Sequence, residues 1–171
     1  GIHRVTHCYN AMSKLHHRDL GLVGMTLLND DIEAELIADG IHTSHKAMQL
    51  LLKFKRDKLT LITDGIRAKG LPGGTYDLGG QEVHVKEGVA RLKDGTLAGS
   101  TLTLNQAFKN IMNLGEDLIQ TSRMLSYHPA KTLNVDHELG QIKSGYLADF
   151  VLMAPDLSIQ KVAVEGQIKN T

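Results

Sequence analysis

The sequence predicts an α/β fold: part of a parallel barrel or sheet, with a small β-layer appended. Strand-like and helix-like segments alternate over residues 32–64, which is typical of a parallel sheet with crossover helices. Residues 140–170 instead alternate short strand-like runs with glycines. A complete eight-stranded barrel needs about 250 residues, whereas this chain has 171. Only three or four strand–helix units are visible, so the pattern indicates about half a barrel.

The first part of the chain supplies the predicted parallel strands. Residues 3–9 alternate as a short strand, and residues 20–28 form an apolar stretch that ends in a turn-like segment. Residues 32–39 and 58–64 predict two further strands, and the second of these is the clearest because its residues are apolar and β-branched. Between them, residues 44–55 have the apolar periodicity of a helix and begin with a serine, a favoured N-cap residue.

The middle of the chain interrupts this alternation. Residues 65–99 are rich in glycine and contain short alternating runs, so we expect hairpins inserted in a long connection. Gly79-Gly80 and Asp94-Gly95 are the expected turns. Helical patterns follow at residues 101–114, 116–128 and 129–135.

Composition argues against several classes of function. The chain has 19 acidic and 19 basic side chains, so it has no charge bias toward nucleic acid. Neither a signal peptide nor an apolar run of membrane-spanning length is visible, and we expect no membrane partner. The single cysteine, Cys8, excludes an internal disulfide framework and favours a cytoplasmic location.

Polar residues lie where the predicted strands end, which is where parallel α/β barrels place their active sites. His7 ends the first strand, residues 39–42 follow the second, and Asp64 ends the third. Barrel hydrolases use this order of residues when a metal activates water and a carboxylate moves the proton. Taken singly, His7 is equally well explained as a capped core histidine, and Asp64 as the N-cap of the next segment.

Several separated motifs strengthen this interpretation. They are "VTHCYNAM", "LHHRDLGLVG", "LIADGIH", "LTLITDGIRAKG", "ARLKDGTLAGSTLTL" and "GQIKSGYLADFVLM". In this order they resemble the N-acetylglucosamine-6-phosphate deacetylases of the amidohydrolase superfamily, over almost all of the chain. The resemblance implies the C-terminal half of a TIM-type (β/α)8 metal-dependent hydrolase barrel at 1–138, with a β-hairpin insertion at about 71–95. It also implies that 139–171 are the C-terminal strands of a small β-sandwich domain.

The resemblance further implies a reaction and its residues. The parent enzyme removes the acetyl group from N-acetylglucosamine 6-phosphate in amino-sugar catabolism, giving glucosamine 6-phosphate and acetate. His7 matches a histidine ligand of the divalent metal, zinc or iron, and Asp64 matches the catalytic aspartate. The positions that match substrate-binding residues are Asn10, Ala11, Arg18 and His42, which act largely through the phosphate, and Leu97, Ala98 and Gly99, in a loop that closes over the sugar. The matching arginine can reach a neighbouring subunit, so we expect a homodimer.

The metal site is the main departure from the family pattern. The family's other metal ligands come from earlier strands, so His7 is the only matching ligand, and we expect the isolated chain to lack part of the metal site and to be inactive. Two other interpretations stay open. One is a different amidohydrolase, acting on a cyclic amide, which would use His7 and Asp64 but not Arg18 and His42. The other is a non-catalytic fragment that binds a sugar phosphate.

Overall fold

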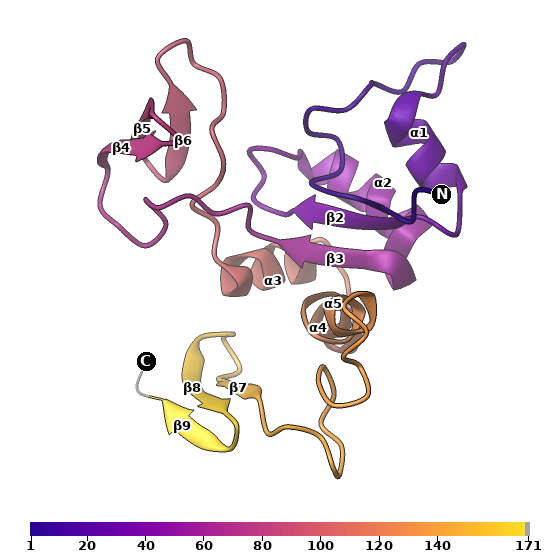
Figure 1. Cartoon of the computed structure of the whole chain (residues 1–171), viewed down its shortest axis with the longest axis vertical. Helices are drawn as coiled ribbons and strands as arrows, with labels where there is room; N and C mark the ends of the chain where they lie inside the picture. Colours follow the sequence, from indigo (N-terminus) through magenta and orange to yellow (C-terminus); the bar gives the residue numbers. More distant parts are fainter. Residues whose placement is uncertain (170–171) are drawn as a thin grey trace.

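Three sheets of three strands each organise the residues that the computed structural model describes, 1–169 (Figure 1). The first sheet is parallel and consists of β1 (Arg4–Val5), β2 (Glu33–Ile37) and β3 (Leu59–Ile62). The second is antiparallel and consists of β4 (Gly74–Leu78), β5 (Gln81–Lys86) and β6 (Val89–Leu92). The third is also antiparallel and consists of β7 (Phe150–Met153), β8 (Ile159–Val164) and β9 (Gln167–Lys169). The predicted α/β class is therefore confirmed.

The parallel sheet has one apolar face, and charged side chains lie on the other. Helices α1 (Gly21–Leu28) and α2 (His45–Lys55) pack on the apolar face, where the buried side chains of Leu36 and Leu61 join one hydrophobic cluster with residues of both helices. On the opposite face, the side chain of Arg4 lies 3.6 Å from Glu33 and 3.4 Å from Glu35. Alternation along each strand produces this division, since neighbouring side chains point to opposite faces.

The first strand is much shorter than the sequence predicted. Residues 3–9 were expected to be extended, but β1 ends at Val5. His7, Tyr9 and Ala11 have φ values of 33°, 80° and 54°, which lie in the left-handed region and cannot continue a strand. The backbone instead folds into tight turns, in which the N–H of Asn10 donates to the carbonyl of His7 at 2.9 Å.

The other predicted elements of this region are present with shorter bounds. The apolar stretch at 20–28 is helix α1, and the strands expected at 32–39 and 58–64 are β2 and β3. Helix α2 begins where its serine predicted, because the Ser44 hydroxyl accepts a hydrogen bond from the N–H of Ala47 at 3.3 Å. A short 3₁₀ helix, η1 (Arg56–Lys58), connects α2 to β3.

The predicted hairpins form the second sheet, which has a small hydrophobic cluster of its own: Ala68, Val83, Val85, Ala90 and Ala98. Gly79 and Gly80 join β4 to β5 with φ values of 59° and 85°, the positive values that a two-residue hairpin turn requires. The turn expected at Asp94-Gly95 is also present, where the N–H of Gly95 donates to the carbonyl of Leu92 at 2.9 Å.

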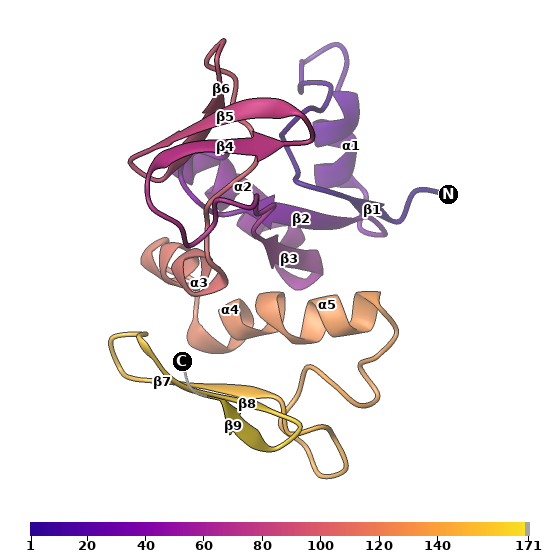
Figure 2. The same cartoon turned by 60° about the vertical axis from the view of Figure 1, so that its left-hand side comes forward.

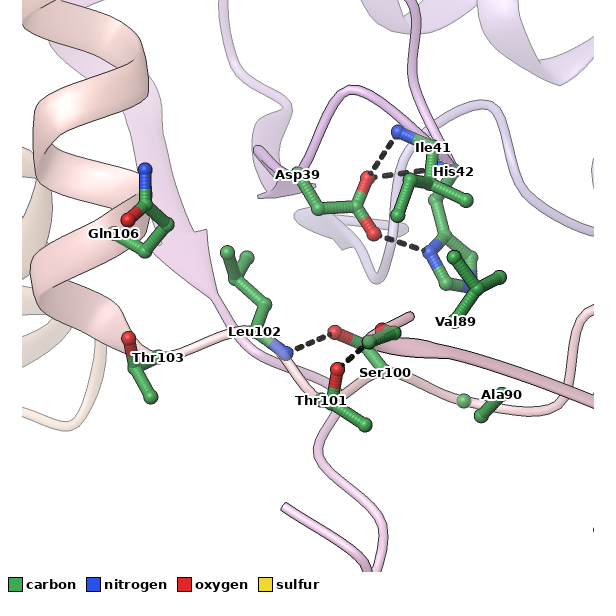
Figure 3. A pocket seen from close by; sticks show the side chains of 12 residues that line it. Asp39, Ile41, His42, Val89, Ala90, Ser100, Thr101, Leu102, Thr103 and Gln106 are labelled. Carbon is green, nitrogen blue, oxygen red and sulfur yellow. Dashed lines mark hydrogen bonds and ion pairs between the residues drawn. The ribbon is translucent and has the colours of Figure 1, made fainter. Parts of the chain in front are cut away.

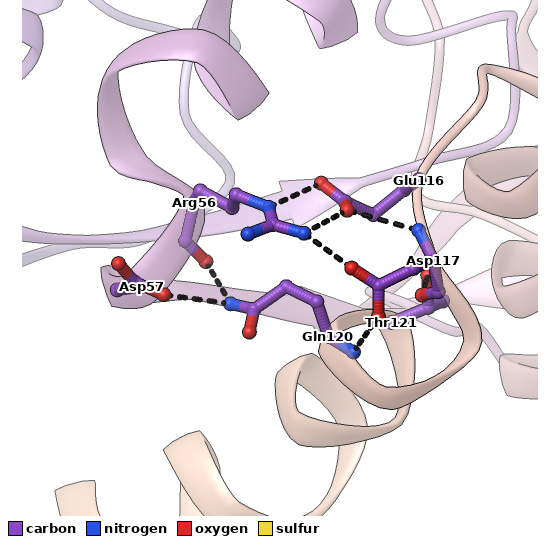
Figure 4. Close-up of polar contacts among 6 residues, drawn as sticks. All are labelled: Arg56, Asp57, Glu116, Asp117, Gln120 and Thr121. Atoms are coloured by element: carbon purple, nitrogen blue, oxygen red, sulfur yellow. Dashed lines mark hydrogen bonds and ion pairs between the residues drawn. The ribbon is translucent and has the colours of Figure 1, made fainter.

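Three helices follow in the predicted order: α3 (Leu104–Asn113), α4 (Leu118–Leu125) and α5 (Tyr127–Thr132). They lie along β3 and separate the parallel sheet from the third sheet (Figure 2). A polar cluster, here called the Arg56 cluster, ties the start of α4 to the end of α2 (Figure 4). In it, Arg56 donates to Glu116 at 2.9 and 2.5 Å and also to Asp117, while Gln120 donates to the carbonyl of Arg56 at 2.8 Å.

The third sheet matches the strands expected in the C-terminal tail, and residues 170 and 171 lie outside the described part of the chain. Its strands lie beyond α4 and are linked to α5 by residues 133–149 (Figure 2). No helix among residues 1–169 is long and apolar enough to cross a membrane. The division into domains at residue 138 stays a prediction, as does the half-barrel.

Candidate active site

A cavity of about 250 Å³ lies beyond the carboxyl ends of the parallel strands. Three segments line it: residues 39–42 after β2, residues 88–90 around the start of β6, and residues 99–106, which lead into α3 (Figure 3). Two of the predicted substrate-binding residues, His42 and Gly99, therefore share one cavity. The second sheet forms one of its walls, so the glycine-rich insertion contributes directly to the site.

Asp39 and His42 form the most tightly bonded polar pair in this cavity. His42 Nδ1 lies 2.6 Å from Asp39 Oδ2, while Asp39 Oδ1 accepts the backbone N–H groups of Ile41 and His42, each at 2.8 Å. Burial alone would raise the pKa of the Asp39 carboxyl, but these hydrogen bonds together hold it below its ordinary value. Asp39 is therefore an anion at neutral pH and can only accept.

The loop at 97–103 is fixed to the end of β3 by backbone hydrogen bonds. The N–H of Ser100 donates to the carbonyl of Asp64 at 2.9 Å, and the N–H of Ile66 donates to the carbonyl of Ser100 at 3.0 Å. On the other side, the N–H of Ala98 donates to the carbonyl of Ala90 in β6 at 3.1 Å. The predicted loop residues thus bridge β3 and the second sheet. Ala98 is buried, while Leu97 and Gly99 are half-buried.

Asp64 lies at the end of β3 with its side chain exposed. Its φ of 48° places the backbone in the left-handed region, which is uncommon for a residue other than glycine. Such conformations cost about 1–3 kcal/mol and occur preferentially at functional sites. The bond from Ser100 to its carbonyl helps to hold this conformation. Position and backbone both suit a proton-transfer group that meets a ligand.

His7, Asn10 and Ala11 lie together in the turns that follow β1. His7 Nδ1 lies 3.1 Å from the carbonyl of Asn10, so this nitrogen donates and the lone pair of Nε2 stays available. Metal-binding histidines commonly have this second contact to a carbonyl. His7 therefore fits a metal ligand, but within residues 1–169 no group of three or more His, Cys, Asp or Glu side chains is placed to hold an ion. The described residues do not make a complete metal site.

Arg18 is not brought into the cavity. It lies exposed in the long loop between β1 and α1, and its Nη1 is 2.7 Å from Nε2 of the neighbouring His17. The residues that line the cavity come from other segments. The structure therefore separates Arg18 from His42, the two residues expected to hold the phosphate.

Asp39 lies in the strand-end segment 39–42, but the sequence resemblance gave it no role. Its signal is the spacing in "DGIH", which allows an aspartate to bond the imidazole three residues later. The hydroxyl residues Ser100, Thr101 and Thr103 were also missed, and they line the cavity together with Gln106. No local pattern marks these four residues, because the hairpin insertion separates them from the strand ends they meet.

Comparison with known proteins gives one family over nearly the whole chain. The amidohydrolase family matches residues 2–169. An N-acetylglucosamine-6-phosphate deacetylase of Vibrio furnissii is 43% identical over 98% of this chain, but the chain spans only 42% of that relative's length. A putative N-acetylgalactosamine-6-phosphate deacetylase of Escherichia coli K12 is 42% identical over 96% of the chain and 99% of the relative. The crystal structure of an N-acetylglucosamine-6-phosphate deacetylase of Thermotoga maritima superposes with a TM-score of 0.94 at 42% identity, covering 98% of this chain and 47% of that one.

Proposed function

Because this chain belongs to the amidohydrolase family, we propose that it supplies the C-terminal part of a hydrolase that removes the acetyl group from N-acetylglucosamine 6-phosphate. The observation that carries the proposal is the cavity beyond the parallel strands, where His42 and Gly99 lie beside a loop bonded to Asp64. Support also comes from the names of the relatives that match over the same residues. The products are glucosamine 6-phosphate and acetate.

In this proposal Asp64 moves the proton. A water oxygen adds to the acetamide carbonyl carbon, and the Asp64 carboxylate accepts the proton that the water loses. The carbon–nitrogen bond then breaks, and Asp64 returns the proton to the nitrogen that leaves as an amine. The exposed position of Asp64 at the end of β3 suits both transfers.

Phosphate and sugar contacts are assigned to the remaining predicted residues. His42 meets the ligand inside the cavity, which Gly99 also lines. The loop of Leu97, Ala98 and Gly99 closes over the sugar. Asn10 and Ala11 contribute from the turns after β1. Arg18 lies outside the cavity, and we propose that it serves the site of a second copy in a homodimer, since a guanidinium binds phosphate bidentately.

A divalent metal, zinc or iron, belongs to the proposal because His7 has the geometry of a ligand. When bound, such an ion lowers the pKa of water to about 7. The described residues do not complete a metal site, so we assign His7 one coordination position and no further step. The remaining ligands would come from the barrel half that precedes residue 1 in the proposed arrangement.

The proposed arrangement keeps the division made from the sequence. Residues 1–138 form the C-terminal half of the barrel, with the second sheet as its insertion, and residues 139–171 belong to a small β-sandwich domain. Its support is the parallel sheet with helices on one face and a TM-score of 0.94 to a deacetylase chain. A cytoplasmic location is proposed from the single free cysteine.

A second candidate substrate is the 4-epimer, N-acetylgalactosamine 6-phosphate. The Escherichia coli relative named for this sugar is 42% identical, against 43% for the Vibrio furnissii relative named for the gluco sugar. Overall identity therefore does not separate the two substrates. Both carry the same acetamide and phosphate, so the residues proposed above would serve either one.

A chimera tests the proposal directly. The segment of the Vibrio furnissii enzyme that matches this chain is replaced by residues 1–171, and acetate release is measured with both 6-phosphates and with unphosphorylated N-acetylglucosamine. We expect release from N-acetylglucosamine 6-phosphate and little from the unphosphorylated sugar. A folded, metal-loaded chimera that releases acetate only from the galacto epimer would reassign the substrate, and one that releases acetate from neither phosphate would overturn the proposal.

A further inference from the structure

The Asp39–His42 pair has a geometry that a simple loop-stabilising aspartate does not need. Both backbone N–H groups of the turn, from Ile41 and His42, bond to Oδ1. The second oxygen, Oδ2, is left for the imidazole alone, at 2.6 Å from Nδ1 (Figure 3). An asparagine would close the same turn with its single oxygen. The carboxylate is required only because a histidine ring faces the second oxygen.

The surroundings hold both partners in place. The side chains of His42 and Asp39 are 9% and 8% exposed. The strand end before them is anchored from α3, where Asn110 Nδ2 donates to the carbonyl of Ala38 at 2.7 Å and Gln106 Nε2 donates to Asn110 at 2.8 Å. Because burial and anchoring restrict the ring, its protonation pattern follows from the one partner at Nδ1.

We propose that Asp39 is a positioning residue that keeps a proton on His42 Nδ1 and thereby presents Nε2 to the ligand in the cavity. This inference rests on the proposed function only for the identity of the ligand, a sugar phosphate. An anionic carboxylate can only accept, so the ring nitrogen facing it must donate. Nε2 then accepts from a sugar hydroxyl in the neutral ring, or donates to a phosphate oxygen when the ring carries a second proton.

Replacement of Asp39 by asparagine reverses this arrangement. The turn N–H groups keep the amide oxygen, so the NH₂ group takes the place of Oδ2 and faces Nδ1. Two donors cannot share a hydrogen bond, so the ring has to accept at Nδ1 and carry its proton on Nε2. The variant therefore changes which ring nitrogen is protonated while retaining shape, volume and the backbone contacts.

Nitrogen-15 NMR of the imidazole rings tests the proposal on the 171-residue chain, with no activity needed. Spectra are recorded at about pH 8, and His42 is assigned from a His42→Gln variant. We expect a protonated Nδ1 in the unaltered chain and a protonated Nε2 in Asp39→Asn. The matched control is Asp156→Asn, because Asp156 also accepts the N–H and hydroxyl of one turn residue, Ser158, and bonds to no histidine among the described residues.

The unaltered chain decides the question even if Asp39→Asn fails to fold. An unprotonated Nδ1 on His42 in that chain would overturn the proposal. The same holds if a folded Asp39→Asn variant still carries the His42 proton on Nδ1. In the active chimera, Asp39→Asn should raise KM for the 6-phosphate about tenfold or more, the scale of one lost hydrogen bond to a charged group, with a smaller change in kcat. An unchanged KM would show that the pair does not serve the ligand. If the unaltered chimera is itself inactive, that result counts against the proposed function and leaves the NMR result standing.

Discussion

Three residues assigned to the proposed site have unusual backbone conformations. His7, Ala11 and Asp64 all have positive φ values and all follow the carboxyl ends of parallel strands. Among residues other than glycine such values are uncommon, and they persist only where the surrounding structure enforces them. In this chain the enforcing contacts are the bonds within the turns after β1 and the bond from Ser100 to the Asp64 carbonyl.

Asp64 is the residue whose chemistry is most directly testable. In the chimera, Asp64→Asn should lower kcat by at least about a hundredfold, since a positioned proton-transfer group contributes on that scale. The thermal midpoint and the metal content should stay close to those of the unaltered chimera, because the exposed carboxylate supports no other part of the fold. Steady-state acetate release measures the effect. Turnover within a few-fold of the original would remove Asp64 from the mechanism.

A substitution of Arg18 can distinguish an effect on phosphate recognition from an effect on folding. Arg18→Ala should weaken kcat/KM for the 6-phosphate by about 2 kcal/mol or more, as expected for a charge-assisted bidentate contact. Unphosphorylated N-acetylglucosamine should be affected little. Lys14→Ala is the matched control, an exposed cation in the same loop. Equal losses on both sugars would indicate a folding defect, and equal losses in both variants would indicate a general charge effect.

At the scale of elements, the loop that bridges β3 and the second sheet depends on Gly99. Its φ is 63°, and a Cβ placed there would lie 2.4 Å from Cγ2 of Ile66. Gly79 offers a matched control, because its φ is 59° and nothing lies within 4 Å of the same added atom. Both alanine variants should be destabilised by about 1 kcal/mol, because a residue with a Cβ is strained in the left-handed backbone conformation.

The free energy of unfolding of Gly99→Ala should be about 1–3 kcal/mol lower than that of Gly79→Ala because of the additional overlap with Ile66. Urea denaturation of the two variants and the original chain measures the difference. Equal free energies of unfolding for the two variants would mean that the loop adjusts freely, and that the close approach of Gly99 to Ile66 does not restrict it.

The Arg56 cluster predicts how stability depends on pH. The hydrogen bond from Arg56 lowers the pKa of Glu116, and the backbone N–H of Gln120, with Arg56 nearby, lowers the pKa of Asp117. A carboxyl whose pKa is lower in the folded state stabilises the fold above its unfolded pKa, about 4.3 for glutamate and 3.9 for aspartate. That stabilisation is lost as the pH falls through the folded pKa values.

The free energy of unfolding should therefore decrease from pH 5 to pH 3. In the Arg56→Gln variant this free energy should decrease less over the same interval. Urea denaturation at several pH values measures both slopes. Arg67→Gln is the control, because Arg67 is exposed and lies outside the cluster. An Arg56→Gln slope equal to that of the unaltered chain would show that the cluster is not coupled to folding.

Local signals in the sequence were sufficient for most elements but not for their junctions. The Ser44 cap and the Gly79-Gly80 turn are encoded within a few residues, so α2 and the β4–β5 hairpin were predicted correctly. The alternation over residues 3–9 favours a strand, but the turn that begins at His7 overrides it. The bond from Ser100 to Asp64 joins residues on either side of the hairpin insertion, and short-range patterns cannot reveal it.

At the scale of the whole molecule, apolar and hydrogen-bonding surface is left uncovered. Within residues 1–169, strand β1 pairs only with β2, and the third sheet exposes several large apolar side chains, among them Val151 (51%), Leu152 (52%) and Ile168 (54%). An edge strand of this kind favours pairing with another chain. Residues 1–171 alone should therefore self-associate, with a sedimentation coefficient that rises with concentration.

The isolated chain should also bind no stoichiometric metal and release no measurable acetate, because His7 supplies one ligand where a catalytic metal site needs about three. Adding the remaining part of the Vibrio furnissii enzyme as a separate chain should restore activity, and the same addition with the Asp64→Asn chain is the control. Metal analysis and acetate release measure the outcome. A monomeric, metal-loaded and active 171-residue chain would contradict the half-barrel proposal.

The separate hydrophobic cluster of the second sheet has a consequence for how this family can diversify. Its five buried residues share no member with the cluster that packs the parallel sheet. Substitutions in this wall of the cavity, for example at Val89, can therefore accumulate without repacking the hydrophobic cluster that buries the parallel strands. Changes of sugar preference are then expected to accumulate in the insertion, whereas Asp64, proposed for proton transfer, lies outside the insertion and can stay constant.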